Sequence, residues 1–158
     1  MSLLLLARAV HIVLGAFWVG TLIFNAAFLL PAMQEAGPNA AAVAAGLMRR
    51  RFLDIVPLAA LLSVLAGLYL YWRVSGGFAP SYMRSTIGMT YGAGAAAALV
   101  ALTLGLGIVR PSMLRAAADR EGVLAAAQAL RARAAAVSRV VAWLLGGTTL
   151  LMAIARYV

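Results

Sequence analysis

Four long apolar stretches most constrain what this chain can fold into. Of its 158 residues, 65% are hydrophobic and only 11% are charged, and the mean hydropathy is +1.00. A helix that crosses a bilayer needs about 20 mainly apolar residues. Four such stretches leave no room for a soluble domain, so they predict an all-α integral membrane protein, a four-transmembrane-helix bundle that forms a single membrane domain over residues 1–158. The expected spans are about Ala9 to Leu30, Phe52 to Trp72, Ile87 to Val109 and Val140 to Ala155.

The first apolar stretch superficially resembles a signal peptide. It is too long for one, no basic region precedes the apolar run, and the sequence Asn-Ala-Ala-Phe at 25–28 is a poor cleavage context. We therefore expect this stretch to be a permanent transmembrane helix.

The net charge of +9 comes entirely from arginines that lie beside the expected spans. Basic residues in this position are typical topology signals, so the charge does not indicate a nucleic-acid partner. Nine arginines fall in the first and third connections and four on the opposite side, which predicts cytoplasmic connections there and both termini outside the cytoplasm. The nine are Arg49, Arg50, Arg51, Arg110, Arg115, Arg120, Arg131, Arg133 and Arg139, and the four are Arg8, Arg73, Arg84 and Arg156.

A proline motif recurs at the ends of the first and third spans. Leu-Pro-Ala-Met at 30–33 and Arg-Pro-Ser-Met at 110–113 are each followed by an alanine-rich stretch, arginines and another span. This order indicates two tandem helical hairpins related by an axis along the membrane normal. Aligning the prolines places Tyr91 opposite His11. The alternative is that proline marks two helix exits independently.

The only histidine, His11, lies near the start of the first span. At 3.6 residues per turn it shares one stripe with Gly15, Trp18 and Asn25, and this stripe is expected to face the bundle. An intramembrane histidine is a site hypothesis by default because imidazole is costly to bury without a partner. Its nitrogens could bond only to water, a carbonyl or a tyrosine, or the imidazole could bind haem iron or copper.

In the haem hypothesis, His11 is an axial ligand of haem b and Trp18 and Tyr91 line the pocket. One histidine cannot supply two imidazoles, so the second position would belong to Tyr91, stay open, or be filled by His11 of a second copy. Arg8 and Arg84 could pair with the propionates. For copper, Met83 and Met89 are the thioethers nearest to His11 in expected depth.

Two further features concern packing. Gly88, Gly92 and Ala96 form a small-residue surface that allows close helix approach and suggests a homo-oligomer or a larger membrane complex. Asp54, at the start of the second span, is expected to pair with the arginines at 49–51.

The stretch from His11 to Phe24, with Gly15, Trp18 and Gly20, resembles the first helix of a superfamily of small helical membrane proteins. This superfamily includes the CopD copper-resistance domain, the membrane domain of a bacterial urate oxidase and HemJ-type protoporphyrinogen oxidase. The resemblance implies that His11 matches their helix-one histidine, associated with haem or copper. It also implies a multi-pass protein of the bacterial cytoplasmic (inner) membrane. The further histidine and the lysine of HemJ-type motifs are absent from this chain.

The leading functional hypothesis is therefore a CopD/HemJ-like membrane protein that is haem-binding or redox-related through His11. Neither paired carboxylates nor a serine-histidine-acid set can be assembled, so no catalytic residue is assigned and enzymatic activity is not favoured. A non-enzymatic accessory or structural subunit, in contact only with lipid and a membrane complex, is the alternative. A copper or small-solute permease is a third reading, although the spans hold few polar residues.

Overall fold

The computed structural model describes residues 2–118 and 124–157, and this part of the chain is helical without any strand. Four of its helices are long and apolar enough to cross a membrane, as the sequence predicts. Their bounds are Leu3–Glu35, Phe52–Val74, Thr86–Arg115 and Gln128–Ile154.

The first, third and fourth spans are longer than the apolar runs predict. Helix α1 (Leu3–Phe24) is capped at its N-terminus by Ser2, whose hydroxyl accepts a hydrogen bond from the backbone N–H of Leu5 at 3.4 Å. Helix α8 (Leu124–Ile154) has 31 residues, about 46 Å at 1.5 Å per residue, and so exceeds the bilayer core of about 30 Å. Alanine and arginine before Val140 are good helix formers, which explains why the helix starts well before the apolar run.

Both spans that carry the proline motif contain a π-helical segment just before the proline. In the first span, α1 continues as η1 (Asn25–Leu29) and α2 (Leu30–Glu35), and in the third, α6 (Thr86–Leu104) continues as η3 (Gly105–Val109) and α7 (Arg110–Ala118). The last backbone N–H before each proline bonds five residues back, from Leu30 to Asn25 and from Arg110 to Gly105. Because a proline ring collides with the carbonyl four residues earlier, widening one turn lets each helix continue through it.

Short elements connect the spans. Helix α3 (Ala40–Arg49) follows a 3₁₀ turn, η2 (Gly37–Asn39), and is separated from α4 (Phe52–Val74) by Arg51, which has a left-handed φ of 55°. The next connection turns through Gly76 and Gly77, with φ of 64° and 81°, into α5 (Pro80–Met83). The second alanine-rich stretch continues the third and fourth spans through α7 and α8. Its centre, at 119–123, lies outside the described residues.

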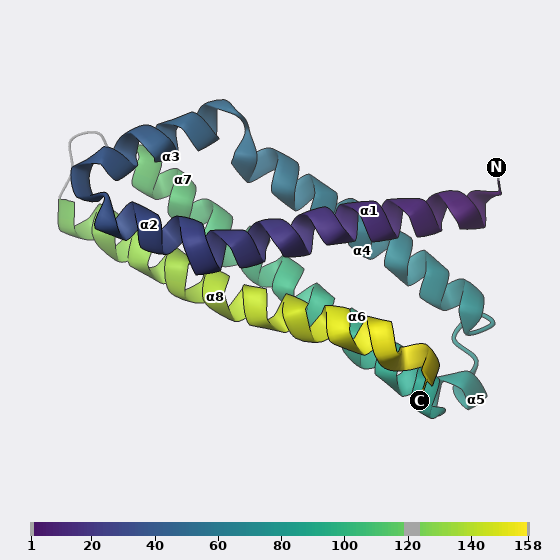
Figure 1. The fold of residues 1–158 in the computed structure, drawn as a ribbon. Coiled ribbons are helices and arrows are strands. Elements are labelled where there is room, and N and C mark those ends of the chain that lie inside the picture. Colours follow the sequence, from purple (N-terminus) through teal and green to yellow (C-terminus); the bar gives the residue numbers. More distant parts are fainter. Residues whose placement is uncertain (1, 119–123, 158) are drawn as a thin grey trace.

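The four spans form two hairpins, α1 with α4 and α6 with α8 (Figure 1). Where the hairpins meet, Trp18 is only 5% exposed and packs with Val64, Leu102, Val141 and Leu145. Lipid tails are as apolar as these side chains, so close packing and not the hydrophobic effect holds the helices together at this point.

The bundle has two unlike ends (Figure 1). At the loop end, the α2–α3 connection and the start of α8 lie together. At the terminal end, α1 begins and α8 finishes in the 3₁₀ turn η4 (Ala155–Tyr157), and the two hairpins diverge. Most packing between the hairpins therefore lies toward the loop end and the middle.

The three glycines in the first half of the third span pack within the chain. A Cβ on Gly88 would collide with the backbone of Tyr82, one on Gly92 would lie 3.0 Å from the Tyr71 hydroxyl, and one on Gly94 would lie 2.9 Å from the Met152 methyl. The close approach predicted for this surface is thus made to α4, α5 and α8 of the same chain.

Candidate functional site

His11 lies on α1 against α4 and is held there by hydrogen bonds in both directions. Its Nδ1 lies 2.8 Å from the carbonyl oxygen of Ser63, and the Ser63 hydroxyl donates to the His11 carbonyl at 3.1 Å. Because a carbonyl only accepts, this contact places the imidazole proton on Nδ1. The lone pair of Nε2 is then free to accept a hydrogen bond or to bind a metal.

Two glycines make this contact between α1 and α4 possible. A Cβ added to Gly67 would lie 2.7 Å from Cε1 and 2.8 Å from Nδ1 of His11, so the imidazole rests directly on the backbone of α4. A Cβ on Gly15 would lie 3.1 Å from the Ser63 hydroxyl oxygen. The four residues His11, Gly15, Ser63 and Gly67, called the His11 clamp below, fix the imidazole while leaving it partly exposed.

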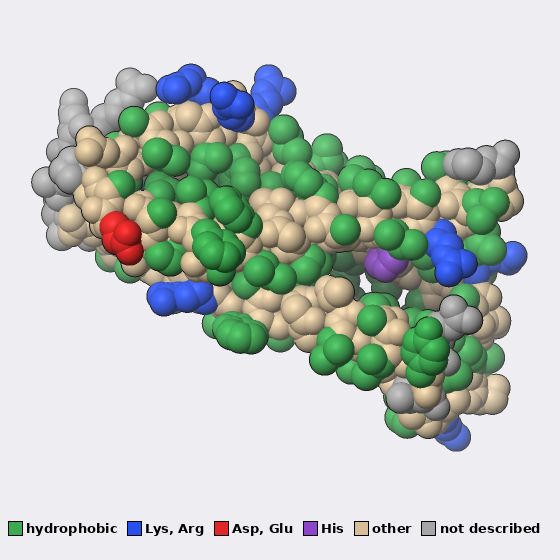
Figure 2. Space-filling model, in the orientation of Figure 1, with side chains coloured by type: hydrophobic (Ala, Val, Ile, Leu, Met, Phe, Trp, Pro, Cys, Tyr) green, Lys and Arg blue, Asp and Glu red, His purple; other side chains and the backbone are tan. Residues whose placement is uncertain are grey.

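Figure 2 shows the histidine in a notch at the terminal end, between the arm that carries α1 and the arm that carries α8. The divergence of the hairpins opens this notch, so the His11 side chain can be reached from outside the packed core.

The other residues predicted around His11 lie in different surroundings. Trp18 is buried in the core between the hairpins. Tyr91 packs against Tyr71, with ring centroids 6.5 Å apart, and no hydrogen bond or ring contact recorded for the described residues joins it to His11. Arg8 and Arg84 are exposed, and neither forms a salt bridge with a described residue.

Tyr71 instead organises an aromatic cluster between α4 and α6 at the terminal end. Its hydroxyl donates to the Gly88 carbonyl at 2.7 Å, and its ring meets those of Phe78, Tyr82 and Tyr91. Burial, followed by the neighbouring Tyr91 and Tyr71, raises the pKa of Tyr82, so its phenol stays neutral. The cluster connects the hairpins next to the notch.

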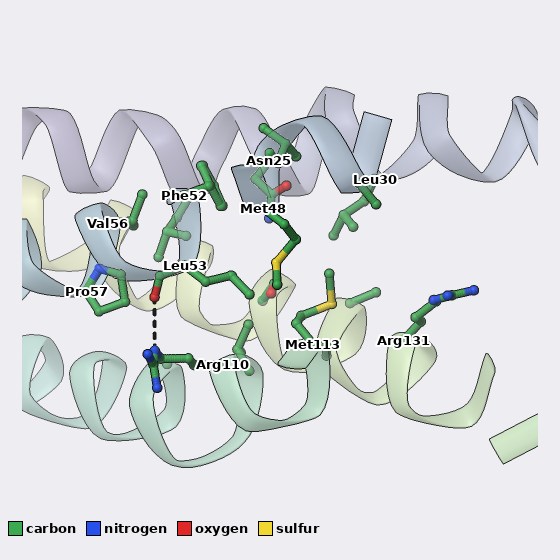
Figure 3. Close-up of a pocket in the computed structure, with 18 of the residues that line it drawn as sticks. Asn25, Leu30, Met48, Phe52, Leu53, Val56, Pro57, Arg110, Met113 and Arg131 are labelled. Atoms are coloured by element: carbon green, nitrogen blue, oxygen red, sulfur yellow. Dashed lines mark hydrogen bonds between the residues drawn. The ribbon is translucent and has the colours of Figure 1, made fainter. Parts of the chain in front are cut away.

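A second candidate site, which the sequence analysis did not predict, is a cavity of about 320 Å³ toward the loop end (Figure 3). Asn25 of η1 and Gly105 of η3 both line it, as do Met48 of α3 and Met113 of α7. Trp18 lines the cavity, whereas no residue of the His11 clamp does. The cavity and the clamp are therefore separate sites.

Arg110 connects the hairpins beside this cavity. Pro57 lies inside α4 and lacks the N–H that would bond the Leu53 carbonyl, and Arg110 Nε bonds that carbonyl at 3.0 Å (Figure 3). A second guanidinium nitrogen lies 2.8 Å from Asp54 Oδ1. The expectation that Asp54 pairs with the arginines at 49–51 is wrong, because the carbonyl freed by Pro57 draws Arg110 to the same turn.

Two signals in the sequence could have indicated the cavity. A widened turn precedes the proline of each motif, and Asn25 is a polar residue at the start of one of these turns. Widened turns of this kind are frequent at functional sites.

The described residues contain no group of three or more His, Cys, Asp or Glu side chains that could hold a metal ion. Any metal centre at His11 would thus take its remaining ligands from other residue types, from a cofactor or from a second copy. No family model, curated protein or solved structure matches the chain.

Proposed function

We propose that this chain is a haem-binding or redox-related membrane protein in which Nε2 of His11 is the donor to the metal. One observation carries the proposal: Nδ1 of His11 faces the Ser63 carbonyl at 2.8 Å. A hydrogen bond from the second ring nitrogen to a carbonyl or carboxylate is the usual support of a metal-binding histidine, since it fixes the tautomer and the ring orientation.

The surroundings of His11 fit one axial ligand of a macrocycle. The imidazole is partly exposed in the notch, the neighbouring surfaces are apolar, and Arg8 lies one helical turn away where it can meet a propionate. Bound haem would supply the redox chemistry, and the clamp would orient the imidazole. Tyr91, an open position or His11 of a second copy remains the proposed source of the second ligand.

The proposed protein type and location rest on the sequence. The His11-to-Phe24 resemblance supports a CopD/HemJ-like protein, with the two hairpins as tandem repeats, in the bacterial cytoplasmic membrane. The arginine bias supports a cytoplasmic loop end and both termini outside.

An absorption spectrum of the detergent-purified protein, with and without added haem, tests the proposal. We expect a Soret band that disappears in His11→Ala. The band should persist in Asn25→Ala, which changes a polar residue of the same stripe at the far end of the helix. A protein that stays colourless after haem addition, or a Soret band that survives in His11→Ala, overturns the proposal.

A specific observation favours a second function, that of an accessory subunit which packs against another helix in the membrane. Trp143 lies about 16 Å from the end of α8, well inside the span, and is 84% exposed. It borders a shallow apolar groove between α6 and α8 that includes Gly147, where an added Cβ would meet nothing within 4 Å. An exposed glycine beside a large side chain is a typical helix-packing surface.

The chain has no cysteine, so single-cysteine variants can test whether this face packs against a second copy of the chain. We expect Gly147→Cys to form a disulfide-linked dimer in the membrane. The control, Gly20→Cys, also adds a side chain at a position without neighbours, on the lipid-facing side of α1, and should stay monomeric. Equal crosslinking of the two variants would exclude a specific homo-oligomer at this face.

A further inference from the structure

We propose that the cavity toward the loop end binds a single-chain long-chain carboxylate, with its acyl tail directed to Trp18 and its head group toward Arg131. This site is independent of the His11 clamp, since no clamp residue lines it.

The first argument is the position of the cavity in the fold. It lies between the two hairpins and is lined by both π-helical segments, through Asn25 on one side and Gly105 and Leu106 on the other. Membrane proteins built from repeats commonly place their ligand sites at the repeat interface. Two widened turns that face one cavity are a feature that helix packing alone does not require.

The second argument is the shape and lining of the cavity. Its wall runs along the first span from Trp18 to Met33, about 22 Å at the rise of a helix, and most of the wall is apolar. Met48 and Met113 face each other across it (Figure 3), and methionine adapts readily to a flexible chain. An elongated apolar cavity lined by methionines suits an acyl chain better than a rigid planar ligand.

The third argument is the set of polar groups in the wall. Ser138 is 4% exposed, and neither its hydroxyl nor the Asn25 amide has a side-chain hydrogen bond recorded within the described part of the chain. Arg131 also lines the cavity and forms no ion pair with a described residue. All three side chains can donate hydrogen bonds, so the complementary head group is anionic and rich in oxygen.

The fourth argument selects one chain over the two of a phospholipid. A volume of about 320 Å³ lies near the lower limit of ligand pockets, which span roughly 300–1,000 Å³. Helix α3 also covers part of the wall through Ala41, Ala44 and Met48. One tail with a small carboxylate fits this partly enclosed space.

Trp18 provides a spectroscopic reporter inside the cavity. In a Trp72→Phe, Trp143→Phe background it is the only tryptophan. Both replaced residues are exposed, so the two substitutions should not disturb the fold. We would titrate this protein, in phosphatidylcholine nanodiscs, with stearic acid brominated in mid-chain and follow tryptophan fluorescence. The expected result is saturable quenching that an excess of unbrominated stearic acid reverses.

Two variants test the location of the site. Gly105→Leu places a side chain into the open space of the cavity, whereas Gly107→Leu makes the same change in the same π-helical segment at an exposed position outside it. We expect Gly105→Leu to weaken the apparent affinity about tenfold or more and Gly107→Leu to leave it unchanged. Circular dichroism and gel filtration verify that both variants fold.

Arg131→Gln, at an exposed position that should not affect folding, tests the head group. It should weaken binding of the brominated acid about tenfold, as loss of a charge-assisted hydrogen bond predicts, and leave binding of the matching brominated alcohol unchanged. Quenching that rises without saturation, or is equal in Gly105→Leu and Gly107→Leu, overturns the proposal. Equal saturable quenching by brominated phosphatidylglycerol would also overturn it, since two-chain lipid would then be the ligand. None of these readouts depends on haem.

Discussion

Both hairpins have a π-helical segment before a proline, but only the first has a histidine packed on a glycine of its partner helix. Pro111 lies 80 residues after Pro31, and each follows a π-helical segment at the same spacing. With the same offset of 80 residues, Gly67 of the first hairpin corresponds to Gly147 of the second. The His11 ring packs on Gly67, whereas a Cβ added to Gly147 would meet nothing within 4 Å. Tyr91, which corresponds to His11 in the second hairpin, packs against Tyr71 instead.

The comparison separates a feature of the backbone, the widened turn before proline, from a feature that depends on particular side chains, the His11 clamp. The widened turn relieves the clash of a proline ring well inside a helix and precedes both Pro31 and Pro111, whereas α4 takes up Pro57 near its start without one. The His11 clamp needs two glycines, a serine and an imidazole at matching heights on two helices, and only the first hairpin has this combination. We therefore expect the π-helical segments, which both hairpins have, to shape the cavity. The His11 clamp, which only the first hairpin has, should carry the function specific to that hairpin.

The largest contrast should come from adding one methyl group to each of the corresponding glycines. In Gly67→Ala the new Cβ meets the His11 ring at 2.7 Å, which we expect to lower the free energy of unfolding by about 1–3 kcal/mol through overpacking. In Gly147→Ala the methyl group meets nothing within 4 Å, and the free energy of unfolding should change by no more than about 0.5 kcal/mol. Denaturant unfolding in detergent, followed by circular dichroism, measures both. Equal losses would show that the clamp is not tightly packed.

A smaller effect is expected from Tyr71→Phe, which tests the connection between the hairpins beside the notch. The variant removes the 2.7 Å hydrogen bond to the Gly88 carbonyl and keeps the aromatic contacts. A net loss of about 1 kcal/mol is expected for one such bond. Tyr69→Phe, in the same helix and without a recorded hydrogen bond in the described structure, is the matched control for the same unfolding measurement. If both variants lose the same stability, the Gly88 bond does not hold the hairpins together.

Composition and pattern were sufficient for the spans but not for their contacts. The spans follow from apolar runs, and a π-helical segment precedes the proline of each motif. The partner of His11 is a backbone carbonyl, which every residue possesses, so no pattern pointed to Ser63. Asp54 was assigned to the nearest arginines in sequence, although Pro57 in the same helix frees the carbonyl that positions Arg110. The proline motifs and Asn25 mark the level of the cavity, but its wall also depends on how α3 lies over the hairpins, which local sequence does not encode.

A still smaller effect is expected from Ser63→Ala, which sharpens the account of the clamp itself. The variant removes the hydroxyl that donates to the His11 carbonyl but keeps the Ser63 carbonyl that faces Nδ1. Hydrogen bonds between membrane helices average about 0.6 kcal/mol, so we expect a loss of that size. The control is Ser138→Ala, which changes a buried serine whose side chain has no hydrogen bond to a described residue. Its free energy of unfolding should fall by less than that of Ser63→Ala. If haem binds, the Soret band should survive in Ser63→Ala, because the backbone carbonyl still orients the imidazole.

The smallest effect should come from the contact between the hairpins at the loop end. Asp54 and Arg110 lie 2.8 Å apart, but their side chains are 60% and 39% exposed, so water and salt weaken their attraction. We expect Asp54→Asn to lower the free energy of unfolding by an amount between zero and about 1 kcal/mol, near the lower limit, with less effect still at high salt. Arg110→Gln should cost more than Asp54→Asn, because Arg110 also bonds the Leu53 carbonyl that Pro57 leaves without a donor. If the two variants are equal at low salt, the ion pair and not the carbonyl bond is what Arg110 contributes. The contribution of Arg110 to the contact between the hairpins would then be electrostatic alone.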